Sequence, residues 1–159
     1  GGRTPPGDAF GTNRTMWRTA QLKSQHEACL AIVQDIHSRS IHIADRAGAV
    51  EITLMLARLT GILRIHLALE DEILYPALRK SSHPRTAEIG ERAWREMGGL
   101  ADVFLDFVDR WKRADVLLAQ QARFRSESAE VFTALAQRID MEHREIYPLA
   151  EQIAATRAA

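Results

Sequence analysis

The sequence is poor in cysteine, in aromatic residues and in unbalanced charge. Its single cysteine, Cys29, excludes an internal disulfide bond and a zinc site built on several thiolates of one chain. Lysine and arginine number 21, as do aspartate and glutamate, so no excess of positive charge is available to hold nucleic acid. No apolar run approaches the roughly 18–20 residues of a membrane span, and nothing near the start resembles a cleavable apolar leader. We therefore expect a soluble, cytoplasmic protein that binds neither nucleic acid nor membrane.

Hydrophobic residues make up 46% of the 159 residues, which suits one globular domain with a single core. Residues 1–14 are rich in glycine, proline and threonine and show no periodicity, so they predict a flexible N-terminal segment. From Thr15 onward apolar residues recur at steps of three and four, without the alternation of a strand. The sequence therefore predicts an all-α domain over residues 15–157.

Four amphipathic helices account for this pattern. We expect them over residues 15–39, 49–80, 85–111 and about 121–155, with the stretch 112–120 left unassigned. The pair Gly98–Gly99 weakens the third helix and marks a bend or a close approach. Short connections between long helices favour an up-down-up-down four-helix bundle, because that arrangement buries every apolar stripe in one core.

A short motif occurs twice in the chain. The segments EDEILYPAL, from Glu70, and EHREIYPLA, from Glu142, share a glutamate followed five and six residues later by Tyr-Pro. The proline inside each helical pattern removes a backbone hydrogen bond and predicts a local kink. In this internal repeat His66 corresponds to Arg138, and His26 of the first helix falls opposite the neighbourhood of Met97 in the third.

Four polar residues interrupt the apolar stripes of three helices. His66 and Glu70 have i, i+4 spacing, so both side chains lie on one helix face. His26 and Glu142 lie on the inward stripes of the first and fourth helices, where they can complete a cluster at one level of a bundle. A carboxylate buried in an apolar core needs a cation or a proton. Imidazole with carboxylate suits iron, manganese or zinc, and we favour iron.

Other interpretations of these residues stay open. A single core histidine is more often hydrogen-bonded than bound to metal, so the cluster is also consistent with a bundle that holds no metal. His143 directly follows the glutamate of the fourth helix and points about 100° away from it on a regular helix. A kink at Pro148 would turn His143 inward, as a ligand or as a hydrogen-bond donor to one.

Four further residues receive structural interpretations. Cys29 is expected to be a small core residue rather than a ligand, and its place one turn after the first-helix histidine leaves redox sensitivity as the alternative. Tyr75 and Tyr147 are expected to pack or to hydrogen-bond near the end of the bundle. Asp71 is assigned to a surface ion pair, which contributes little stability.

The combination of motifs resembles the hemerythrin family in its broad HHE cation-binding form. The resemblance covers about residues 15–155 and rests on the first-helix histidine, the string HLALEDEILYP from His66 to Pro76, and E-x-x-x-x-Y-P in the fourth helix. It implies a four-helix bundle with two irons bridged by two carboxylates and completed by histidines. Carried over by position, Glu70 and Glu142 would be the bridges, and His26 and His66 would bind one iron.

The ligands of the second iron are missing from this pattern. Met97 and Arg138 stand where the family offers ligands, and neither is a usual ligand of non-heme iron. The arginine instead brings permanent positive charge close to the two carboxylates. We therefore predict a site for one metal ion, with Arg138 paired to a carboxylate and Met97 filling the vacated volume.

The family resemblance implies several functions: reversible oxygen binding, sensing of oxygen or nitric oxide, iron handling, and repair of iron centres. Reversible oxygen carriage draws on two irons, so the incomplete ligand set argues against a carrier. We expect a protein that senses or responds to a small diatomic ligand or to redox state and passes the signal to a protein effector. Two alternatives are a mononuclear iron enzyme that acts on oxygen, peroxide or nitric oxide, and a metal-free bundle that serves interaction.

Overall fold

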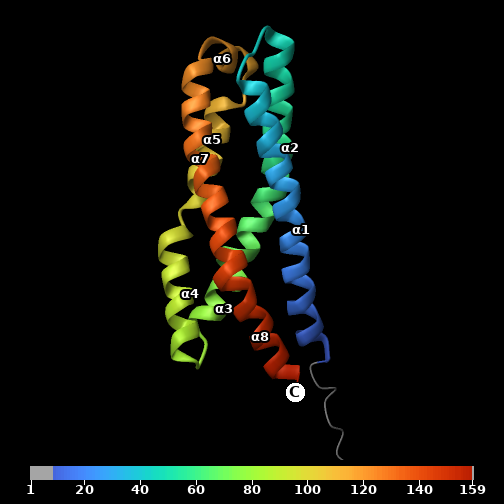
Figure 1. The fold of residues 1–159 in the computed structure, drawn as a ribbon, viewed down its shortest axis with the longest axis vertical. Coiled ribbons are helices and arrows are strands. Elements are labelled where there is room, and N and C mark those ends of the chain that lie inside the picture. Colours follow the sequence, from blue (N-terminus) through green and yellow to red (C-terminus); the bar gives the residue numbers. More distant parts are fainter. Residues whose placement is uncertain (1–8, 159) are drawn as a thin grey trace, which may run out of the picture.

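The computed structural model describes the backbone of residues 9–158 and the side chains of residues 19–156, and this part of the chain is helical without strands (Figure 1). The elements are α1 (Ala9–Ser40), α2 (Arg46–Leu69), the π-helix η1 (Glu70–Leu74), α3 (Tyr75–Arg79), α4 (Pro84–Met97), α5 (Leu100–Trp111), α6 (Ala114–Ala119), α7 (Gln121–Met141), the π-helix η2 (Glu142–Ile146) and α8 (Tyr147–Ala158). The prediction of an all-α chain is confirmed.

The helix boundaries differ from the predicted ones mainly at the start and in the third segment. Helix α1 begins at Ala9, so residues 9–14 are helical where we expected a flexible segment, and residues 1–8 lie outside the described part. The Gly98–Gly99 pair separates α4 from α5, where one weakened helix was expected. The unassigned stretch 112–120 contains the short helix α6.

The helices run along the long axis of the molecule, as Figure 1 shows. Helix α1 packs against α2 over much of its length and against α7 and α8 beyond that. Helix α5 contacts α2 and α7, and α4 contacts α3. The described helices therefore enclose a common interior as a helical bundle.

The starts of two helices follow directly from the sequence. The side chain of Asp45 accepts a hydrogen bond of 2.9 Å from the backbone N–H of Gly48, and so caps α2. Pro84 opens α4, where its missing N–H has no helical partner to lose.

Each predicted kink is a single π-helical turn. In η1 the backbone N–H of Tyr75 bonds to the carbonyl of Glu70, and in η2 that of Tyr147 bonds to the carbonyl of Glu142. Proline follows directly after each of these tyrosines, and it cannot donate the next bond of a regular helix. Both π-turns therefore begin at the glutamates that the repeated motif predicts as metal ligands.

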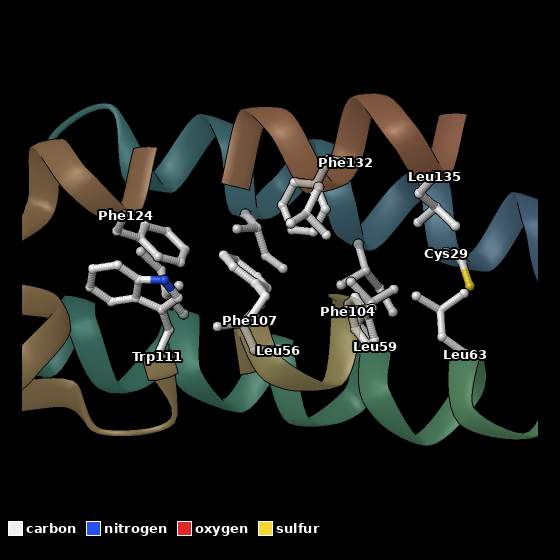
Figure 2. Close-up of a cluster of buried hydrophobic side chains, with 14 of the residues drawn as sticks. Cys29, Leu56, Leu59, Leu63, Phe104, Phe107, Trp111, Phe124, Phe132 and Leu135 are labelled. Carbon is white, nitrogen blue, oxygen red and sulfur yellow. The ribbon is translucent and has the colours of Figure 1, made fainter. Parts of the chain in front are cut away.

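The interior consists of two apolar clusters with a polar layer between them. The larger cluster includes the stacked and edge-to-face rings of Phe107, Phe124, Phe132 and Trp111, with ring centres 5.3–5.9 Å apart (Figure 2). The smaller cluster surrounds the two buried tyrosines, toward the end of the bundle that α3 and α8 form. The polar layer lies where α1, α2 and α7 pass from one cluster to the other.

One helical run bears on the expectation that the protein does not bind a membrane, which stays a prediction. The continuous helical run Arg46–Arg79 is long and apolar enough, by length and composition, to cross a membrane. A single such helix is weak support for a membrane span, because a core helix of a bundle passes the same test. In this structure the run carries buried His66 and Glu70 within its apolar length.

Candidate metal centre

The structure brings together the four residues that the sequence predicts as metal ligands. His26 comes from α1, His66 from α2, Glu70 opens η1 and Glu142 opens η2. One ligand atom from each lies within 4.8 Å of the other three, and all four side chains are buried. Two imidazoles and two carboxylates thus face one point inside the bundle.

The distances between these atoms suit a single bound ion. Nε2 of His26 lies 2.9 Å from Nε2 of His66 and 3.0 Å from Oε2 of Glu142. Nε2 of His66 lies 3.0 Å from Oε1 of Glu70. Neighbouring ligands about 2.1 Å from an octahedral ion are separated by about 3.0 Å. These three separations therefore match those between neighbouring ligands of one ion, and the four side chains form a group that can hold a metal ion.

Several polar atoms crowd around one nitrogen of this cluster. Nε2 of His26 has three polar neighbours at about hydrogen-bond distance, namely His66, Glu142 and the hydroxyl of Tyr147 at 3.1 Å. An imidazole nitrogen carries at most one proton, so it can donate to only one of them. A cation at this point would accept the lone pairs of both histidine nitrogens and of the carboxylates together.

Arg138 pairs with both glutamates of the cluster. Its Nε donates to Oε1 of Glu142 at 2.9 Å, and its Nη2 donates to Oε1 of Glu70 at 3.2 Å. Only 1% of the arginine side chain is exposed, so the charge is held away from water. The predicted pairing of Arg138 with a carboxylate is therefore present, and it involves both carboxylates.

A third carboxylate joins this network. Oδ1 of Asp71 accepts from Nη2 of Arg138 at 2.9 Å, and the aspartate is only half-buried. The assignment of Asp71 to a surface ion pair is therefore wrong. With all three carboxyl groups ionised, three negative charges against one positive charge leave two negative charges, which one divalent ion balances and two would exceed.

Met97 contributes a backbone atom. Its carbonyl oxygen accepts from Nη1 of Arg138 at 3.1 Å, at the point where the Gly98–Gly99 pair ends α4. The side chain is half-buried and packs against the smaller apolar cluster. Met97 thus helps to hold the arginine through its main-chain carbonyl. The prediction from sequence considered only the volume of its side chain and did not include this contact.

The two glutamates have opposite shifts in pKa. Burial alone would raise the pKa of Glu142, but the hydrogen bond with His26, the charge of Arg138 and the hydrogen bond from Tyr75 outweigh burial and lower it to about 2. Burial and the charge of Glu142 raise the pKa of Glu70 above its ordinary range, against the opposing effect of His66. Without metal, Glu142 is therefore the carboxylate and Glu70 the group that tends to keep a proton.

The second nitrogen of each histidine has its own partner. Nδ1 of His26 lies 2.8 Å from Nε2 of His143, and Nδ1 of His66 lies 2.8 Å from Oε1 of Gln25. Such outer hydrogen bonds fix the ring so that the other nitrogen faces an ion. The sequence leaves two roles open for His143, a metal ligand or a hydrogen-bond partner of a ligand. In the structure His143 is exposed and contacts the predicted ligand His26, which is the second of these roles.

Two tyrosines complete the polar layer, although the sequence predicts for them only packing or a hydrogen bond near the end of the bundle. The hydroxyl of Tyr75 donates to Oε1 of Glu142 at 2.5 Å, and that of Tyr147 donates to Oε2 of Glu70 at 2.6 Å. Each tyrosine therefore bonds the glutamate of the other motif. Burial and the neighbouring carboxylates raise the pKa of both phenols, so both are neutral donors in the absence of a cation.

Cys29 takes no part in the cluster. It is fully buried in the larger apolar cluster, and burial together with the charge of Glu70 raises its pKa to about 11. The thiol is therefore un-ionised at neutral pH, which agrees with a core residue and not with a reactive one.

Comparison with known proteins identifies the family. Residues 18–150 match the hemerythrin HHE cation binding domain, which is most of the chain and includes every residue of the cluster. A comparison with curated proteins finds no match, and a comparison with solved structures finds none either. The chain belongs to the hemerythrin HHE cation-binding domain family, and its buried histidine and glutamate side chains form a group that can hold a metal ion.

Proposed function

We propose that this protein binds one non-heme iron ion through His26, His66, Glu70 and Glu142. The observation that carries the proposal is the guanidinium of Arg138, which is buried and donates to both carboxylates. A buried arginine there supplies the positive charge of a second ion and occupies its place. Zinc and manganese suit the same donors, so the identity of the metal is part of the test.

The residues around the ion have separate tasks in this proposal. Bound iron would supply one-electron redox chemistry and affinity for small diatomic molecules. Gln25 and His143 orient the two imidazoles, and the two tyrosines fix the glutamates by hydrogen bonds. The apolar clusters on both sides of the layer exclude water and strengthen these electrostatic contacts.

We propose sensing of, or response to, oxygen, nitric oxide or redox state as the biological role. A site for one ion suits ligand binding or redox response better than reversible carriage by two irons. We also propose that the bundle has an up-down-up-down four-helix topology. We propose further that the protein is cytoplasmic and that a protein effector receives its signal. The antiparallel course of the long helices in Figure 1 supports the topology.

Elemental analysis tests the metal site. Protein purified without added metal, and protein loaded anaerobically with ferrous iron, are expected to hold about one iron per chain. Arg138→His, which supplies an imidazole where the arginine charge lies, is expected to raise that number. Two irons per chain in the unmodified protein would contradict the role of Arg138, and no metal in either preparation would favour a metal-free bundle.

Nitric oxide tests the diatomic ligand. Addition to the anaerobic ferrous protein is expected to change its visible absorption, because the four protein ligands leave positions open on an octahedral ion. Protein loaded with zinc is the control, since zinc has no redox chemistry. An unchanged spectrum of a fully iron-loaded sample would contradict ligand binding at the iron.

A further inference from the structure

The two tyrosines of the repeated motif occupy different sides of the polar layer. The hydroxyl of Tyr75 contacts Oε1 of Glu142, the same oxygen that accepts from Nε of Arg138. The guanidinium also lies over the Tyr75 ring, 5.0 Å from its centre. Tyr75 therefore belongs to the arginine side of the glutamates.

Tyr147 lies on the histidine side. Its hydroxyl oxygen is 3.1 Å from Nε2 of His26, 2.6 Å from Oε2 of Glu70 and 3.3 Å from Oε2 of Glu142. Its ring stacks on the imidazole of His26 at 15°, and the tyrosine is fully buried. The hydroxyl oxygen thus lies within 3.3 Å of a nitrogen or oxygen of three of the four candidate ligand residues.

The difference between the tyrosines follows from the difference between the two motifs. The first motif has His66 one turn before its glutamate, and the second has Arg138 at that place. Each tyrosine reaches across to the other half of the bundle, so Tyr147 meets the histidine side and Tyr75 meets the arginine. The sequence repeat is therefore symmetrical in its tyrosines, but the site is not.

We propose that the hydroxyl oxygen of Tyr147 is a fifth protein ligand, which the site uses for a hard trivalent ion such as ferric iron. This inference rests on the proposed metal site. On binding, the O–H bond of the phenol breaks, a metal–oxygen bond forms, and the proton leaves to solvent. The added negative charge of the phenolate balances the one positive charge by which a trivalent ion exceeds a divalent ion.

Visible spectroscopy of the ferric protein tests this ligand, because ferric phenolates have a charge-transfer band that ferric carboxylates and imidazoles lack. The chain contains two tyrosines, so Tyr75→Phe leaves Tyr147 as the single source of such a band. Iron is supplied as ferric citrate, and iron per chain and far-UV circular dichroism are measured on every sample. We expect the band in the unmodified protein and in Tyr75→Phe, and its loss in Tyr147→Phe when absorbance is expressed per bound iron.

Proton release provides a second readout. In weakly buffered solution, ferric binding is expected to release one proton more from the unmodified protein and from Tyr75→Phe than from Tyr147→Phe. If Tyr147→Phe does not fold, the band of Tyr75→Phe alone assigns the ligand. Bound ferric iron without a band, or a band that persists in Tyr147→Phe, would overturn the fifth ligand and leave the four-residue site standing. Absence of bound iron from all three proteins would overturn the proposed site itself.

Discussion

Arg138 and Glu142 lie one helical turn apart, and Nε of the arginine donates to Oε1 of the glutamate inside the bundle at 2.9 Å. The same guanidinium pairs with Glu70 and Asp71. Breaking a buried ion pair at one partner leaves charge without compensation. In the metal-free protein this arginine therefore supplies the positive charge that faces all three carboxyl groups.

Arg138→Gln is expected to lower the free energy of unfolding of the metal-free protein by about 3–5 kcal/mol. Urea denaturation in the presence of a chelator measures this, and Arg138→Lys, which keeps the charge, is the control with a smaller loss. Added divalent metal is expected to recover more stability in Arg138→Gln than in the unmodified protein, because the ion then replaces a missing positive charge. Equal denaturation midpoints for the unmodified protein and Arg138→Gln would refute this role.

Glu142→Gln and Glu70→Gln are expected to change the stability of the metal-free protein in opposite directions. The pKa of Glu142 is lowered in the folded state to about 2, so its carboxylate contributes stability above the ordinary pKa near 4.5, and this contribution is lost as pH falls toward 2. The pKa of Glu70 is raised, so the folded state favours its protonated form, and that preference is lost as pH rises through the raised value. At neutral pH the neutral amide therefore destabilises the protein at position 142 and stabilises it at position 70.

Thermal unfolding with a chelator at pH 7 measures both substitutions, and metal content measured separately is expected to fall in each. The difference between Glu142→Gln and the unmodified protein is expected to shrink as the pH is lowered from 5 to 3. Two shifts of the same sign at pH 7 would show that the carboxylates are not differentiated as described.

His143→Ala is expected to weaken metal binding by about 10–100-fold with little change in folding. The exposed His143 ring holds Nδ1 of the buried His26, and loss of such an outer partner leaves the ligand ring less well oriented. Competition with a chromophoric chelator measures the affinity. His42→Ala, in the exposed loop between α1 and α2, is the matched control and is expected to bind metal as the unmodified protein does.

Gly90→Ala and Gly61→Ala are expected to have opposite effects on unfolding. A Cβ at Gly90 would lie 2.7 Å from Cβ of Leu78 and 2.8 Å from the backbone nitrogen of Arg79, so α4 and α3 would have to separate. Overpacking of this kind costs about 1–3 kcal/mol. A Cβ at Gly61, within α2, meets nothing within 4 Å, and replacing a helical glycine by alanine adds about 0.5–1 kcal/mol. Denaturant unfolding measures both variants, and we expect a lower midpoint for Gly90→Ala and a higher one for Gly61→Ala than for the unmodified protein. A higher midpoint for both would show that the close contact of α3 with α4 is unimportant.

Helical periodicity was sufficient to predict the all-α chain and the inward position of the four candidate ligands. His66 and Glu70 follow from i, i+4 spacing, and His26 and Glu142 follow because polar residues interrupt apolar stripes. These rules describe one regular helix at a time. They therefore predict which residues of a helix point toward the core, because that depends only on the position of each residue around its own helix.

The residues that sequence reasoning missed depend on a helix irregularity and on contacts across the bundle. Tyr147 comes five residues after Glu142, which on a regular helix places it about 140° away from that glutamate. The π-turn of η2 adds a residue to the turn and brings its hydroxyl within 3.3 Å of the same glutamate. The spacing E-x-x-x-x-Y-P, present in both motifs, is the signal that could have revealed this. Asp71 was missed because its partner, Arg138, lies 67 residues away.

The crossed hydrogen bonds of the tyrosines make the site a joint between two halves of the chain. The half before α4 supplies two imidazoles and one carboxylate, and the half from α4 onward supplies the other carboxylate, the guanidinium and the phenol of Tyr147. Neither half holds a complete set of donors. Separation of the two halves by a few ångströms would divide the proposed ligands between them and release a bound ion, so we expect metal occupancy and the docking of the two halves to be thermodynamically linked.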